Sequence, residues 1–162
     1  MTKDQPTDEL LSDDEERQLA IRCFNSVWQL MEKQNRTIED DDLMLHMAHA
    51  SRYHWGQVGR SENVVRGEWQ VSRVYAVLRR PEPCLHHAQR ALDICLGNGI
   101  GDWDIAFAYE ALARGHALGG DAEAARAMTE RALGAAETIA DDEDRNLVLA
   151  DLETVPGQER FW

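Results

Sequence analysis

Apolar residues recur along this chain at the three- and four-residue spacing of helices, and no segment alternates with the two-residue period of a strand. The first helical face, for example, carries Leu19, Phe24, Val27, Leu30 and Met31. Capping residues, glycines and prolines divide the pattern into segments. The pattern predicts seven helices, at about residues 13–34, 37–56, 61–79, 83–96, 102–118, 122–140 and 142–153.

Residues 102–118 are almost entirely apolar and lie between two pairs of glycines. A segment that is apolar on all sides is predicted to be a helix buried among others. Glu110 and Arg114 are polar exceptions, and their spacing of four places them on the face that carries Phe107 and Trp103. A polar pair on the aromatic side of a buried helix indicates a groove.

The segments form pairs that repeat every 41 residues. Arg90-Ala91-Leu92 recurs as Arg131-Ala132-Leu133, and Ala50 precedes Ala91 by the same interval. Repeats of this kind are typical of stacked helical hairpins. We therefore expect an all-α protein with hairpins at about 13–57, 58–98 and 99–140 and a capping helix at 141–154. These elements make up one domain at 13–156, between a disordered acidic lead-in at 1–12 and a tail at 157–162.

One glycine bears directly on this register. The 41-residue interval aligns Gly67 with Ala108, inside two predicted helices. Glycine in a helix interior costs about 1 kcal/mol relative to alanine. A glycine at this position is therefore expected where two helices nearly touch.

The third hairpin resembles the signature of the tetratricopeptide (TPR) family. Residues 113–125 read Ala-Arg-Gly-His-Ala-Leu-Gly-Gly-Asp-Ala-Glu-Ala-Ala, and Ala132-Leu133 follows. The family pattern has a small residue in the first helix, a Gly-Asp turn and two alanines seven residues apart. In the first two hairpins the alanine places are taken by Leu43, Ala50, Cys84 and Ala91. The repeat here exceeds the family length of about 34 residues by about two helical turns, which preserves the facing surfaces.

This resemblance implies a right-handed solenoid whose first helices line a concave, peptide-binding face. Its lining would include Trp28, Arg66, Trp69, Arg73, Phe107, Glu110 and Arg114. Because arginine binds carboxylates through a bidentate fork, we expect a protein or peptide partner that offers an acidic segment or a free carboxylate. The alternative is that the aromatic residues belong to the core and the arginines pair with Glu68, Glu110 and other local acids.

Charge narrows the classes of partner. Acidic residues outnumber basic ones 30 to 17, and the net charge is -13. This balance argues against binding to nucleic acid and to anionic membrane surfaces. Residues 1–12 lack the features of a signal peptide, and no apolar run has the length of a membrane span. We expect a cytoplasmic protein in which Cys23, Cys84 and Cys95 are buried thiols.

No catalytic or cofactor motif stands out, so no cofactor is expected and the chain is predicted to be a non-enzymatic interaction module. Two alternatives stay open. The first is a small helical metal-dependent enzyme that uses His46 and His49, three residues apart, with nearby carboxylates. The second is a self-associating structural scaffold, for example a homodimer formed through apolar end faces. Cys84 lies near His86 and His87, but its place in the repeat predicts a core residue and not a nucleophile.

Overall fold

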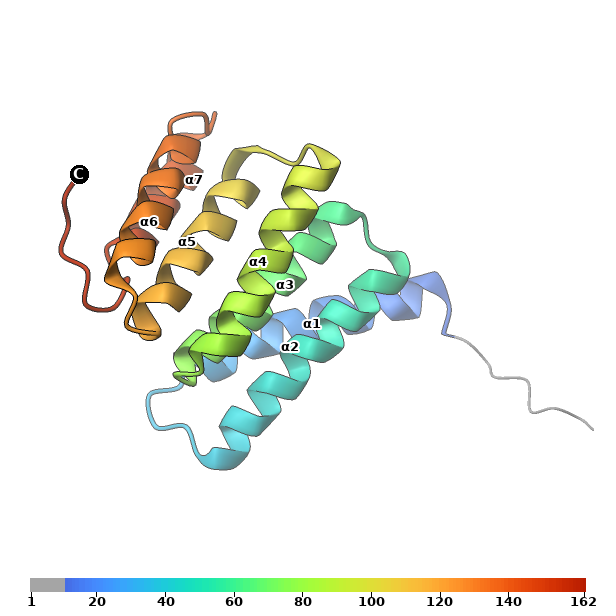
Figure 1. Ribbon diagram of the computed structural model, residues 1–162. Helices are drawn as coiled ribbons and strands as arrows, with labels where there is room; N and C mark the ends of the chain where they lie inside the picture. The colour runs from blue at the N-terminus through green and yellow to red at the C-terminus, as the bar shows by residue number, and fades with distance from the viewer. Residues whose placement is uncertain (1–10) are drawn as a thin grey trace, which may run out of the picture.

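The computed structural model describes residues 11–162, and most of the predicted lead-in lies outside this range. Within it the chain forms seven helices and no strand, which confirms the all-α prediction (Figure 1). The helices are α1 (Asp13–Glu32), α2 (Ile38–Val58), α3 (Ser61–Val77), α4 (Pro81–Asn98), α5 (Asp102–Leu118), α6 (Ala122–Ala136) and α7 (Asp142–Leu152). None of them combines the length and the apolar composition that crossing a bilayer requires.

Local sequence explains most helix ends. Ser12 and Glu15 form a capping box at the start of α1, and Asp121 accepts a hydrogen bond from the backbone at the start of α6. The prediction for the end of α6 was wrong by four residues. Arg145 of α7 donates hydrogen bonds to the carbonyls of Ala136 and Ile139, and so satisfies the backbone where α6 stops.

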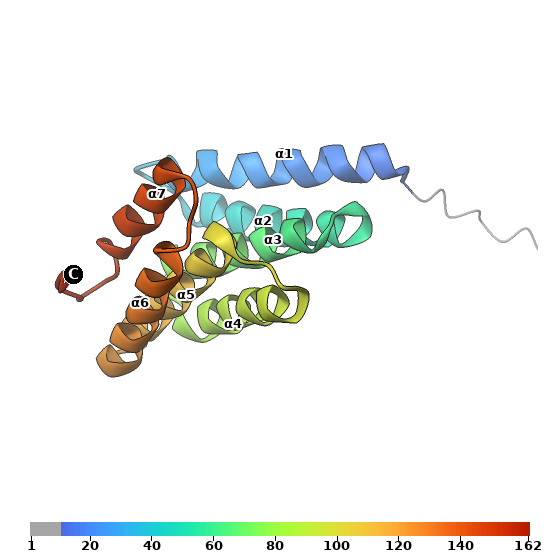
Figure 2. The same cartoon turned by 90° about the horizontal axis from the view of Figure 1, so that it is seen from above.

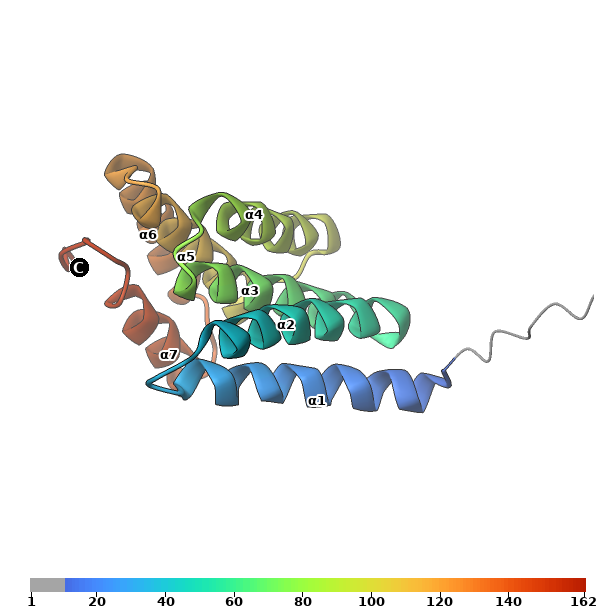
Figure 3. The same cartoon turned by 90° about the horizontal axis from the view of Figure 1, so that it is seen from below.

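The helices pack as a stack of hairpins. α1 packs on α2, α3 on α4 and α5 on α6, and the second helix of each hairpin also contacts the first helix of the next element. The first helices form their own row, in which α1 touches α3, α3 touches α5 and α5 touches α7. Figure 2 shows α1 and α7 toward one side of the molecule and α4 and α6 toward the other. The view from below shows α3 between α1 and α4 (Figure 3).

The register of the second helices corrects the predicted repeat. The buried residues of α4 and α6 correspond at the predicted interval, in the pairs Cys84 and Ala125, Ala88 and Thr129, Ala91 and Ala132, and Cys95 and Ala136. In α2, however, the buried residues are Met44, Ala48 and Ser51. The equivalent of Ala91 in the first hairpin is therefore Ser51. The prediction that Ala50 and Leu43 fill the two alanine places of this hairpin was wrong by one residue. One residue turns a side chain by about 100° around a helix, so Leu43 is 46% exposed while Met44 is fully buried.

Gly67 lies at a close approach of α3 and α2, as its mid-helix position predicted. A Cβ atom added there would stand 3.3 Å from Cα and 2.9 Å from Cδ of Arg52. Arg52 cannot move freely, because its guanidinium is bonded to Glu68. The sequence-based expectation of a tight helix contact at Gly67 is therefore confirmed.

We expect Gly67→Leu to destabilise the protein by about 1–3 kcal/mol, because the added side chain overpacks the α2–α3 contact. Thermal or urea unfolding measures the change. Gly134 of α6 is the matched control, since a Cβ atom there would meet nothing within 4 Å. Gly134→Ala is expected to stabilise the protein by up to about 1 kcal/mol through helix propensity. An unchanged melting temperature for Gly67→Leu would contradict the close contact.

Candidate functional site: an aromatic groove on the first helices

A row of aromatic rings crosses the first helices of the three hairpins. Trp28 of α1 lies 5.7 Å from Trp69 of α3, and Trp69 lies 5.5 Å from Phe107 of α5, measured between ring centroids. Phe24 and Trp103 extend the row at its two ends, at 6.2 Å from Trp28 and 6.1 Å from Phe107. All five side chains are half-buried. Each ring therefore packs against its neighbours and also presents part of its surface.

Arg66 of α3 lies beside this row. Its Nε and Nη2 donate hydrogen bonds of 3.0 and 3.1 Å to the two carboxylate oxygens of Asp104. Its guanidinium carbon lies 4.3 Å from the ring centroid of Trp103, a cation–π contact. Hydrogen bonding to Asp104 raises the pKa of Arg66. The Arg66 side chain nevertheless keeps 39% of its surface exposed, so it remains open to a further ligand group.

Two hollows meet at Arg66. One, of about 60 Å³, is lined by Val65, Arg66, Trp69, Trp103, Asp104 and Phe107. The other, of about 210 Å³, is lined by Ile21, Phe24, Asn25, Trp55, Asn63 and Arg66. We use the name aromatic groove for these two hollows together with the five-ring row. The groove draws residues from the N-terminal halves of α3 and α5, the middle of α1 and the end of α2.

The remaining predicted lining residues form an ion network next to the row, in which the Arg73 guanidinium carbon lies 5.6 Å from the ring centroid of Trp69. Arg114 donates to Glu110 through Nε at 2.8 Å, and to backbone oxygens of Asp151 and Thr154 in the segment that ends α7. Arg73 of α3 bonds to the Asp151 carboxylate and lies 3.7 Å from Glu110. Burial raises the pKa of Asp151, and the charge of Arg73 opposes that rise. The network therefore attaches α7 to α3 and α5 and leaves Arg66 as the most exposed of the three arginines.

Sequence reasoning placed Trp28, Trp69 and Phe107 on one face, and the structure brings their rings together. Trp103 was placed on the same helix face as Phe107 but was not counted among the lining residues, and the structure adds it to the row. Sequence reasoning missed Asp104 and Asp151 as the partners of Arg66 and Arg73. No local pattern marks such pairs, because they join residues 38 and 78 positions apart.

Glu68 does not pair with the arginines of the groove. Glu68 is 3% exposed, and its carboxylate bonds to Arg52 of α2 and to His87 and Arg90 of α4. Burial alone would raise the pKa of Glu68, but the hydrogen bonds from His87, Arg52 and Arg90 outweigh it and lower the pKa to about 2. This cluster joins α2, α3 and α4. The alternative that the arginines pair with local acids is therefore confirmed for Arg114 and Glu110, but it was wrong for Glu68.

The structure also places the histidines and cysteines. His49 bonds to the hydroxyl of Tyr75 at 3.1 Å, and His46 is exposed on the same helix. Across residues 11–162, no three His, Cys, Asp or Glu side chains are grouped so that they could hold a metal ion. Cys84 is fully buried, and burial raises the pKa of its thiol. Burial likewise raises the pKa of Cys95 to about 12, so both thiols stay protonated at neutral pH.

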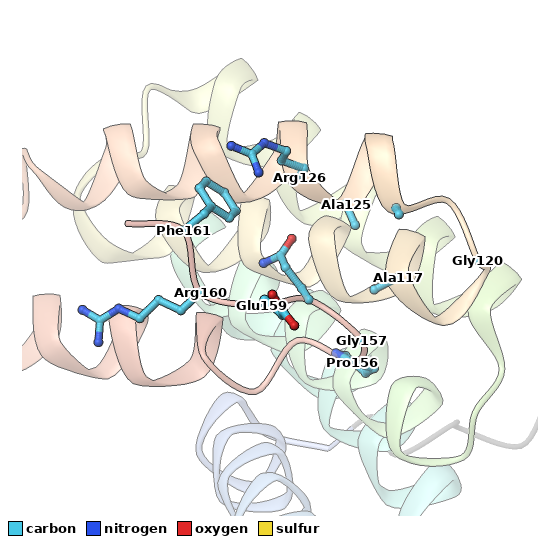
Figure 4. Close-up of a pocket in the computed structure, with 11 residues that line it drawn as sticks. Ala117, Gly120, Ala125, Arg126, Pro156, Gly157, Glu159, Arg160 and Phe161 are labelled. Carbon is cyan, nitrogen blue, oxygen red and sulfur yellow. The ribbon is translucent and has the colours of Figure 1, made fainter.

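A third hollow, of about 450 Å³, lies between the α5–α6 turn and the segment that follows α7 (Figure 4). Arg126 of α6 stacks over Phe161 at 3.9 Å, and Gln158 bonds to Thr129 of α6. The predicted tail thus packs along α6. The lining of this hollow holds a single aromatic ring, that of Phe161, whereas five rings form the row of the aromatic groove. The aromatic groove is therefore the stronger candidate for a binding site.

The chain matches no protein-family model, and it shows no significant similarity to any curated protein.

Proposed function

We propose that this protein is a TPR-like interaction module and that its aromatic groove binds a peptide segment of a partner protein. The observation that carries the proposal is the continuous row of five half-buried rings on α1, α3 and α5. Partly exposed aromatic residues supply large contact area at low cost in side-chain entropy, and they are enriched in protein interfaces. The resemblance of the third hairpin to TPR repeats supports the same face.

The charged side chains around the groove limit how many negative charges the expected ligand carries. Arg73 and Arg114 are committed to Glu110 and Asp151, with side chains only 13% and 10% exposed. Arg66 is the arginine that borders both hollows of the groove. The ligand is therefore a mainly apolar segment with one carboxylate directed at Arg66, and not a long acidic run.

The test begins with selection of random displayed peptides against the purified full chain. Selected peptides are then titrated while tryptophan fluorescence is followed, since Trp28, Trp55, Trp69 and Trp103 are four of the five tryptophans and all belong to the groove. We expect saturable fluorescence changes that weaken as salt is raised, because a partly exposed charge pair is screened.

Arg66→Lys is expected to lower the affinity of these peptides by about tenfold, a change of about 1.4 kcal/mol in binding free energy. The reason is that lysine keeps the charge but lacks the planar guanidinium group that binds a carboxylate through two hydrogen bonds. Arg126→Lys is the matched control. Arg126 also pairs with a carboxylate and stacks on a ring, but it lies on α6, outside the groove. Selection that yields no peptide affecting groove tryptophans, or equal losses for the two variants, would contradict the proposed function.

A further inference from the structure

The larger hollow of the groove has the size and walls of a socket for one side chain. Its volume is about 210 Å³. A cavity of about 150 Å³ is enough to hold benzene, so this hollow can accept a six-membered ring. The smaller hollow on the other side of Arg66, at about 60 Å³, has room only for a small aliphatic group. The two hollows thus set different size limits on neighbouring groups of a ligand.

The walls of the larger hollow favour an aromatic occupant. Phe24 and Trp55 supply two ring surfaces from α1 and α2, and Ile21, 44% exposed, supplies an aliphatic edge. Aromatic pairs gain stabilisation beyond the burial of their area. Ile21 therefore offers apolar surface to a group that enters this hollow.

The rim of this hollow is polar. Asn25 makes no side-chain hydrogen bond within residues 11–162, and Asn63 uses its carbonyl oxygen to accept a bond from the backbone of Arg60. The amide nitrogen of Asn63 therefore remains available as a donor. Donors and acceptors at the mouth of an aromatic socket suit the backbone or the phenolic hydroxyl of an inserted residue.

Arg66 also lines the larger hollow, and its positive charge is complementary to a carboxylate of the ligand. Its only hydrogen bonds to the described residues are the two from Nε and Nη2 to Asp104. Nη1 is thus left to donate to a second carboxylate. Because Arg66 lines both hollows, a carboxylate that it binds must lie next to the group that fills the socket.

We propose that the groove recognises an aromatic side chain adjacent to an acidic residue in a partner peptide. The aromatic ring enters the hollow between Phe24 and Trp55, and the neighbouring carboxylate binds Arg66. This inference rests on the proposed function, since it specifies the ligand of the same groove. It names the features that distinguish ligand peptides from other apolar segments.

A plug variant tests the socket without disturbing the core. Asn25 is exposed on α1, and Asn25→Trp places a large side chain at the mouth of the hollow. Asn146→Trp is the matched control, because Asn146 is an exposed asparagine on α7 and borders neither hollow of the groove. Both variants are first checked for unchanged helical content and unfolding transition by circular dichroism.

Peptides selected against the wild-type chain are expected to share an aromatic residue next to Asp or Glu. Asn25→Trp should weaken the binding of these peptides at least tenfold, and Asn146→Trp should weaken it less than twofold. Replacing the peptide's aromatic residue by alanine should lower its affinity for the wild-type chain at least tenfold, and so should replacing its acidic residue by the corresponding amide. Groove-binding peptides without this pair, or peptides indifferent to Asn25→Trp, would overturn the inference while leaving the proposed function intact. Absence of any groove-binding peptide would instead overturn both.

Discussion

Arg114→Ala is expected to destabilise the protein by about 3–5 kcal/mol, the cost of removing one partner of a buried ion pair. Arg114 is 8% exposed and Glu110 is 1% exposed. One Glu110 oxygen already lacks a hydrogen-bond partner among residues 11–162. Loss of Arg114 would leave this carboxylate with only the more distant Arg73, at 3.7 Å, and would release the end of α7. Urea unfolding at neutral pH measures the effect.

A pair with the same spacing provides the control for Arg114. Arg126 and Glu130 are also four residues apart on a helix, but their side chains are 58% and 57% exposed. Arg126→Ala should therefore cost no more than about 1 kcal/mol. Replacing both members of the buried pair, as Arg114→Met with Glu110→Leu, should recover part of the loss because no buried charge remains. Similar losses of stability for Arg114→Ala and Arg126→Ala would contradict a stabilising effect of burying the Arg114–Glu110 pair.

Glu68→Gln is expected to lower the free energy of unfolding by about 3 kcal/mol at neutral pH. The pKa of Glu68 falls from 4.5 to about 2 on folding, and each pKa unit is worth about 1.4 kcal/mol. A carboxylate with a depressed pKa in the folded state stabilises that state above its unfolded pKa. This stabilisation is lost as the pH falls from about 4.5 to about 2. The difference between wild type and variant should therefore shrink across that interval.

Unfolding by urea at a series of pH values between 7 and 2 tests this linkage. Glu130→Gln is the control, since Glu130 is exposed and should contribute less than about 1 kcal/mol at any pH. A constant difference between Glu68→Gln and wild type over the whole series would contradict the assigned role of the carboxylate. It would point instead to a purely steric effect of the substitution at the junction of α2, α3 and α4.

The groove illustrates how far a family resemblance reaches. The resemblance to TPR hairpins implied that Trp28, Trp69 and Phe107 line one face before their rings were known to touch. The hollow between Ile21 and Trp55 could not be foreseen in this way, because it needs α1 and the end of α2 beside the start of α3. Its occupant is a proposal that depends on this packing.

The sequence by itself determined the seven helices, most of their ends and the pairing into hairpins, because caps, glycines and apolar spacing act over three or four residues. Tertiary structure decided the one-residue shift that buries Ser51 in place of Ala50. It also decided which carboxylate meets each arginine: Asp104 for Arg66 and Asp151 for Arg73. Charged side chains of many positions could satisfy such pairs equally well, and only the packing of helices distant in sequence selects among them.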